Sequence, residues 1–319
     1  MVPSKAHRDH RGPAATDLVA SVPQPEHAAR PTKRWPNLFV VGAAKAGTTS
    51  LWFYLEQHPE IYMSPTKEPH YFSQIHPDPK LAMFYPHVAD ETAYLALFDG
   101  ATSEKVIGEA STSYLWDAEV PGRIKPVAPD ASIIIMLRDP VARAYSHYWN
   151  DAAEGFETRT FLEAVEEDMV RPVRGWGFSP LYVHAGLYSE SIERYRDLFG
   201  ERVMIILFEE FVDDVRGHMR SVFRFLKVDP EFAEAIELEP QNVFKVPRNT
   251  LARQLLGAFG LRRKARAVLP QRLHPPMRNL LVKRGAKPGM EPEARALLAQ
   301  FYRADIERVR ALLGRALPW

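Results

Sequence analysis

A loop bracketed by two glycines carries the clearest chemical signal in the chain, at residues 42–49. Lys45 lies between Gly42 and Gly47, and Thr48 follows the second glycine directly. A short apolar run precedes this loop, and a helical pattern of apolar residues begins after it. A strand, a glycine loop and a helix N-terminus direct several backbone N–H groups at one point. The stretch therefore predicts an anion site, and phosphate is the usual occupant of such a site.

The position of the lysine leaves more than one interpretation open. A Walker A loop has the same glycine spacing, but its lysine directly follows the second glycine. Thr48 occupies that position here. One alternative is a loop that holds a single terminal anionic group, with Lys45 directed at the leaving oxygen. The others are a degenerate nucleotide triphosphatase and a purely structural turn.

A carboxylate, Glu109, follows the short predicted strand Val106–Gly108. Ligands of open parallel sheets bind at the carboxyl ends of the strands. Glu109 is therefore either a structural acid or a general base, and its position alone favours neither.

Polar residues also crowd a segment that two prolines keep from becoming a helix. Lys67, Glu68, His70 and Tyr71 all lie in it. The segment is either a solvated loop or one lip of the anion site, because a short excursion from the first helix can return beside the loop.

A second cationic position follows the clearest predicted strand, Ser132–Leu137. Arg138 comes directly after it, and Asp139 and Pro140 form a typical helix start. Ser146 lies away from the apolar face of that helix. A Walker B strand would present an acid to Mg²⁺ here, so the pattern favours a second anion site, unless Arg138 merely pairs with a carboxylate.

Taken together, four ordered motifs resemble the superfamily of sulfotransferases that use 3′-phosphoadenosine-5′-phosphosulfate (PAPS). The resemblance covers residues 36–211 and is closest to the branch of heparan sulfate N- and 3-O-sulfotransferases and many bacterial enzymes. The motifs are GAAKAGTTSL, KEPHYF, GEASTSYL and MLRDPVARAYSHYW.

The resemblance implies a role for each matching residue, and it implies no metal. Lys45 would stabilise the leaving phosphate and Glu109 would be the general base, with His70 in reserve. Arg248 lies where the family often has a Lys-Gly turn that contacts the 3′-phosphate. The donor-binding residues would be Ala43, Ala44, Lys45, Ala46, Gly47, Thr48, Thr49, Arg138, Ser146 and Arg248, and the substrate contacts Lys67, His70 and Tyr71.

Composition is that of an ordinary soluble globular chain of 319 residues, with a net charge of +1. This balance gives no global attraction to nucleic acid. Zero cysteines exclude disulfides and thiolate sites and suit a reducing compartment, so we expect a cytoplasmic protein. No apolar run approaches the roughly 20 residues that span a bilayer.

Residues 1–34 read as a disordered leader, and residues 35–319 as a single domain. Its basic segment, 250–290, is either a solvated face or a mobile lid that attracts an anionic acceptor or touches a membrane surface. We expect the acceptor pocket to be built from that segment, from the insertion at 74–100 and from the 170–185 loop. The loop contributes Trp176, Phe178, Tyr182 and His184.

The sequence thus predicts an α/β fold with a P-loop-like central parallel sheet, flanked by helices on both faces. The predicted activity is sulfuryl transfer from PAPS to a hydroxyl of a carbohydrate or small metabolite. A P-loop kinase or triphosphatase and an inactive anion-binding module are the alternatives. The sequence does not indicate an oligomeric state.

Overall fold

The computed structural model describes residues 34–73, 87–154, 156–172, 174–176, 180–238, 245–247, 282–285 and 287–319. Residues 34–319 belong to one compact unit. Residues 1–33 of the predicted leader and most of the basic segment lie outside the described residues, as do Phe178 and Arg248. Of the 74–100 insertion, the structure describes residues 87–100, which contain a short helix, α2 (Glu91–Ala96).

A five-stranded sheet with the strand order β2-β3-β1-β4-β5 forms the centre of the fold. Every pairing within it is parallel, which confirms the predicted sheet. A separate antiparallel pair joins β6 (Lys245–Pro247) to β7 (Val282–Arg284). The strands of the central sheet are β1 (Leu38–Gly42), β2 (Ile61–Met63), β3 (Val106–Ala110), β4 (Ser132–Leu137) and β5 (Val203–Leu207).

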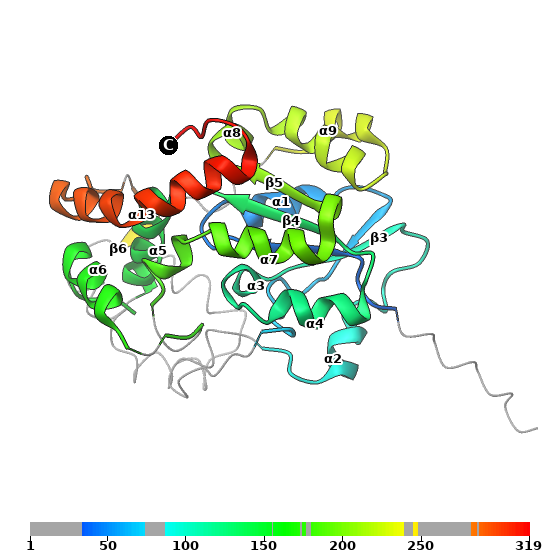
Figure 1. Ribbon diagram of the computed structural model, residues 1–319. Coiled ribbons are helices and arrows are strands. Elements are labelled where there is room, and N and C mark those ends of the chain that lie inside the picture. Colours follow the sequence, from blue (N-terminus) through cyan, green and yellow to red (C-terminus); the bar gives the residue numbers. More distant parts are fainter. Residues whose placement is uncertain are drawn as a thin grey trace, which may run out of the picture. The chain divides into compact units, whose positions relative to one another are not determined.

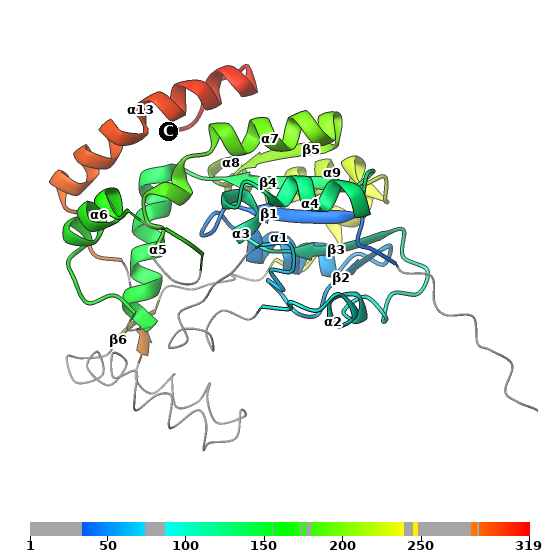
Figure 2. The same ribbon diagram turned by 60° about the horizontal axis from the view of Figure 1, so that its bottom comes forward.

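Helices cover both faces of this sheet (Figure 1). One face carries α1 (Thr48–Glu56) and α9 (Val215–Phe225), and the other carries α3, α4 and α7. Turning the molecule shows α5 beside α6 at one end of the sheet, with α13 running past both (Figure 2). The remaining bounds are α3 (Ser113–Trp116), α4 (Val120–Val127), α5 (Pro140–Glu154), α6 (Phe161–Val170), α7 (Ser189–Phe199), α8 (Phe208–Asp213), α13 (Pro292–Leu313) and the 3₁₀ turns His184–Gly186, Gly200–Arg202 and Pro230–Glu234.

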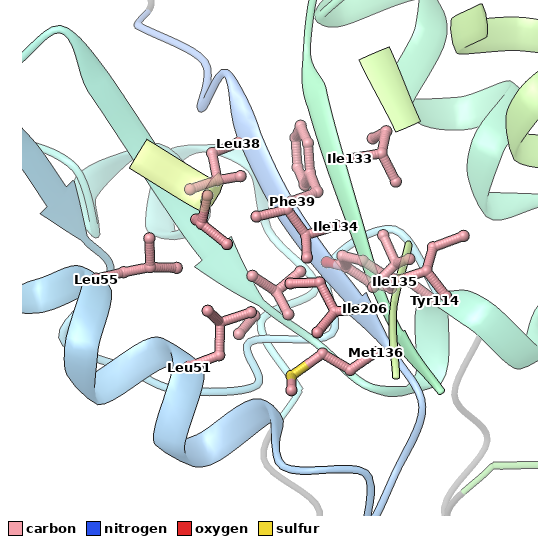
Figure 3. Close-up of a cluster of buried hydrophobic side chains, with 14 of the residues drawn as sticks. Leu38, Phe39, Leu51, Leu55, Tyr114, Ile133, Ile134, Ile135, Met136 and Ile206 are labelled. Carbon is pink, nitrogen blue, oxygen red and sulfur yellow. The ribbon is translucent and has the colours of Figure 1, made fainter. Parts of the chain in front are cut away.

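The core lies between the sheet and these helices, and β4 contributes a long, fully buried apolar run to it. Ile133 to Leu137 are fully buried, as expected for a β-branched run covered on both faces. Leu51 and Leu55 of α1 point at the strand side chains from one side, and Tyr114 approaches from the other (Figure 3). This packing holds the carboxyl ends of β1, β3 and β4 at a common edge.

Candidate active site

The glycine loop leads from β1 into α1, and its two glycines are required by both backbone and packing. Both have positive φ, 148° at Gly42 and 91° at Gly47. A Cβ would approach Leu115 Cβ to 2.7 Å at Gly42 and Phe208 Cδ2 to 2.8 Å at Gly47. Gly47 is the N-cap of α1 and no side chain caps the helix, so its first N–H groups are available to a ligand.

Lys45 lies at the centre of this loop, with a left-handed backbone at φ 67°. Its Nζ donates to Asn150 Oδ1 of α5 over 3.0 Å. Burial lowers the pKa of Lys45, while the nearby carboxylates of Asp151 and Glu68 oppose that shift. The ammonium group is thus held among acceptors at the carboxyl edge of the sheet.

Arg138 extends from the end of β4 toward the same loop. Its guanidinium donates to the Lys45 carbonyl over 3.0 Å and lies 4.5 Å from the centre of the Phe208 ring. Its buried Nε has no hydrogen-bond partner among the described residues. Burial lowers the pKa of Arg138, and the charges of Glu209 and Tyr188 offset that lowering only in part. A partly desolvated cation with an unused donor indicates a site for an anion.

Ser146 of α5 completes this second site together with a residue that the sequence did not single out. Lys287 Nζ donates to Ser146 Oγ over 3.1 Å. Burial, with the positive charges of Arg138 and Lys45, lowers the pKa of Lys287 to about 8. Three cations and a hydroxyl therefore converge beside the glycine loop. In the sequence Lys287 was one of many basic residues, and its pairing with Ser146 spans 141 positions.

Glu109 does not lie at the edge where the sequence placed it. The strand β3 continues to Ala110, so Glu109 is inside it and is fully buried. Tyr94 and Tyr114 donate to its Oε1, each over 2.7 Å, and Ser111 donates to its Oε2 over 2.6 Å. Burial raises the pKa of Glu109. With its oxygens taken by core hydroxyls, this carboxylate has the surroundings of a structural acid, and the geometry argues against its use as the base.

Glu68 is a partly exposed carboxylate near the loop, whereas Asp151 is buried. Its backbone N–H donates to the Ala110 carbonyl at the end of β3, over 2.9 Å. Lys67 Nζ lies 2.6 Å from its Oε1, and Thr112 donates to its Oε2 over 3.1 Å. Burial alone would raise the pKa of Glu68, but Lys67 and His70 outweigh it and hold the pKa well below its usual range. The side chain keeps 29% of its surface exposed. An ionised, accessible carboxylate beside Lys45 can accept a proton.

His70 and Tyr71 follow Glu68 in the chain but have different surroundings. His70 is buried, with Nε2 3.3 Å from Glu68 Oε2, so it belongs to the Glu68 site. Tyr71 stacks on Tyr94 at 4.2 Å between ring centres and packs against Trp35. Of the expected substrate contacts, Lys67 and His70 therefore lie at the site, and Tyr71 lies in an aromatic cluster of the core.

A cavity of about 400 Å³ adjoins the loop. Trp176 and His184 of the expected acceptor surface line it, together with Ala44 and with Thr112, which holds Glu68. Tyr182 is buried instead and donates to Asp151 over 3.0 Å. Most of the other lining residues come from α3, α7 and α13, and they include Trp116, Arg194, Phe301 and Arg308.

In the described part of the chain, no cluster of His, Cys, Asp or Glu side chains has an arrangement suited to a metal ion. None of the helices that the structure describes is both long and apolar enough to span a bilayer.

Residues 36–233 match the profile of a family described as "Sulfotransferase family". A solved sulfotransferase from Alicyclobacillus acidocaldarius superposes with a TM-score of 0.67 at 33% identity, covering 89% of this chain and 98% of that one. Mouse carbohydrate sulfotransferase 15 is 29% identical over 61% of this chain and 44% of its own length. Human heparan sulfate glucosamine 3-O-sulfotransferase 3B1 is 25% identical over 68% and 58%.

The chain thus spans about half the length of these curated relatives. The family match covers well over half of the present chain and contains the loop, Glu68, Arg138 and Ser146. On this basis the chain belongs to the sulfotransferase family.

Proposed function

We propose that this protein transfers a sulfuryl group from PAPS to a hydroxyl of a carbohydrate acceptor, and that Glu68 is the general base. One observation carries the proposal. Lys45 interacts both with an ionised carboxylate, Glu68, and with two further cations, Arg138 and Lys287. A donor with an anionic group at each end needs both anion sites, and an acceptor hydroxyl needs the base.

The residues present fit PAPS. The N–H groups of the loop and α1 suit its 5′-phosphosulfate, which is the group transferred. The unused donor of Arg138, the Ser146 hydroxyl and Lys287 suit its 3′-phosphate. Two groups of donors for two phosphates favour this nucleotide over one that carries charge at a single end.

In the proposed reaction, Glu68 acts on the acceptor and Lys45 acts on the leaving group. Glu68 takes the proton of the acceptor hydroxyl as the acceptor oxygen bonds to sulfur. The bond between sulfur and the 5′-phosphate oxygen breaks, and Lys45 neutralises the charge that remains on that oxygen. A positioned base contributes on the order of 10² to 10⁴ in rate, and charge stabilisation at the leaving oxygen a further 10² to 10³.

Support for a carbohydrate acceptor comes from the relatives and from the cavity. The relatives' names state that they act on carbohydrate and on heparan sulfate glucosamine. The cavity beside Thr112 offers aromatic faces from Trp116 and Trp176, which suit the apolar face of a sugar ring.

The test is transfer of labelled sulfate from PAPS across a panel of saccharides, hydroxylated metabolites and amines. We expect labelled saccharide with the wild-type protein and a loss of at least 10² in rate with Glu68→Gln. Absence of transfer to every class, with stabilisation by ATP and Mg²⁺ instead of adenosine 3′,5′-bisphosphate (PAP), would overturn the proposal in favour of a kinase or triphosphatase.

A further inference from the structure

A continuous line of polar contacts runs inward from Glu68. His70 Nε2 lies 3.3 Å from Glu68 Oε2, and His70 Nδ1 lies 2.7 Å from Ser113 Oγ. Ser113 Oγ is in turn 2.6 Å from Ser73 Oγ. His70, Ser113 and Ser73 are all buried, with at most 4% of their surface exposed. Bulk water therefore does not satisfy these groups, and their donors and acceptors must match one another.

The directions of these hydrogen bonds follow from the charge on Glu68. Lys67, 2.6 Å away, favours the ionised carboxylate, which can only accept. An unprotonated Nε2 would direct its lone pair at the carboxylate oxygen and repel it, so Nε2 carries the proton. The remaining nitrogen of a neutral imidazole, Nδ1, is then an acceptor and requires a donor.

Ser113 is positioned to be that donor. A hydroxyl has one proton to give and can accept two hydrogen bonds. If Ser113 gives its proton to His70 Nδ1, its contact with Ser73 requires Ser73 to donate. Every group in the line is then satisfied, in the order Ser73 to Ser113 to His70 to Glu68.

We propose that Ser113 is a positioning residue for sulfuryl transfer: supported by Ser73, it fixes His70 as the tautomer whose Nε2–H faces the Glu68 carboxylate. This rests on the proposed function only for the role of Glu68. Ser113 does not touch the reacting atoms. It acts through His70, which keeps Glu68 oriented and ionised until an acceptor hydroxyl delivers its proton.

Other ionisable groups surround this line without replacing Ser113. Lys67 contacts Glu68 from the same segment, and Lys45 faces it from the loop. The positive charge on a protonated His70 would act on Glu109 of β3, and Glu68 acts on His147 of α5. Among the residues named here, Ser113 is the one that contacts Nδ1, so Ser113 sets the tautomer.

The tautomer can be measured directly by ¹⁵N NMR of the imidazole nitrogens in the full-length protein, with His70 identified by the signals that His70→Gln removes. We expect His70 to carry its proton on Nε2, and a shift toward the Nδ1–H form in Ser113→Ala. Ser64→Ala is the matched control, because Ser64 is equally buried and its hydroxyl donates to the Thr66 carbonyl instead. A wild-type His70 that is cationic or carries its proton on Nδ1 would overturn the proposal, as would equal effects of both serine variants.

Kinetics supply a second readout. In Ser113→Ala, Glu68 loses an oriented donor to its charged form, so the acid limb of the kcat profile should move up by about one pH unit. The KM for PAPS should not change, and Ser64→Ala should keep the wild-type profile. Ser73→Ala, which removes the donor behind Ser113, should move the limb in the same direction by less. If Ser113→Ala does not fold, Ser73→Ala serves as the test variant. An acid limb that stays at its wild-type pH, together with an unchanged His70 tautomer, would overturn the inference. A wild-type protein that transfers nothing from PAPS would count against the proposed function, whereas the NMR result would still decide the tautomer.

Discussion

At the scale of single residues, Lys45 illustrates how the fold prepares a cation for a charge that appears only during reaction. Its ammonium group donates a hydrogen bond to the Asn150 side chain, and burial already weakens its hold on a proton. A new negative charge on a leaving oxygen would be a better partner than a neutral amide. Lys45 is therefore poised to stabilise the product side of the transfer.

Lys45→Ala should lower kcat by about 10² to 10³, because it removes a preorganised charge at the leaving oxygen. Its melting temperature should stay near that of the wild type, since only one hydrogen bond to a side chain is lost. Transfer assays and circular dichroism melts check the two statements. Lys105→Ala is the control, because Lys105 is 65% exposed and pairs with Glu60 away from the loop. Equal losses in both variants would contradict the role of Lys45.

Two further substitutions, one at Glu68 and one at Glu109, distinguish the roles of these glutamates. Glu68→Gln should lower kcat by about 10² to 10⁴ while PAP affinity is retained. Glu109→Gln should keep kcat within about threefold, because an amide oxygen can still accept from the two tyrosines and Ser111 can accept from its NH₂. If Glu109→Gln abolished transfer and Glu68→Gln did not, the base would be Glu109.

At the scale of elements, α5 joins the two halves of the site. It presents Ser146 to Lys287 and Asn150 to Lys45, and at the position after Asn150 it buries Asp151. Burial raises the pKa of Asp151 from 3.8 to about 6, although Asn150, Tyr182 and Lys45 act against that rise and Glu157 adds to it. The helix thus carries an acid that is costly to ionise beside a lysine that is costly to protonate.

The sign of the pH effect follows from that shift. Between pH 4 and pH 6 the folded protein keeps a proton on Asp151 that the unfolded chain has released, so stability falls as pH rises through this window. A shift of about two units corresponds to about 3 kcal/mol. Asp151→Asn should therefore gain about that much on the wild type between pH 4 and pH 7, measured by urea unfolding. Asp130→Asn, at a residue that is 80% exposed and paired with Arg202, should show no such gain. If the difference in unfolding free energy between Asp151→Asn and the wild type were constant from pH 4 to pH 7, the raised pKa of Asp151 would be contradicted.

Elements built from continuous local patterns could be predicted from the sequence. The bounds of β4 and β5 agree with their β-branched runs, and Asp139 does cap the first turn of α5, accepting from the Val141 N–H over 3.0 Å. The end of β3 could not be predicted, because two more residues pair with β1 beyond the apolar run. That difference moved Glu109 from the edge of the sheet into its core. A strand end thus decides where Glu109 lies, while the loop and Arg138 were located by their own motifs.

At the scale of the whole molecule, the second anion site depends on contacts that no local pattern contains. Ser146 and Lys287 are 141 positions apart in the sequence, and the chain as a whole carries a net charge of only +1. The attraction for a phosphate is therefore local, made by folding and lost on unfolding. A ligand bound at this site should stabilise the entire domain.

The 3′-phosphate is the part of the ligand that reports on this long-range contact. PAP at 100 times its Kd should stabilise the protein by about 2.7 kcal/mol, and AMP, which lacks the 3′-phosphate, should bind more weakly. Lys287→Ala should reduce the ratio of AMP Kd to PAP Kd by about tenfold and leave the AMP Kd unchanged, because the lost charge faces only the 3′-phosphate. Thermal shifts over a titration of each nucleotide give both constants. Lys125→Ala, whose Nζ donates to the Pro129 carbonyl, is the matched control and should leave the ratio at its wild-type value. Equal weakening of PAP and AMP by Lys287→Ala would instead place that lysine at the 5′ end of the nucleotide, and the two-site arrangement would have to be assigned differently.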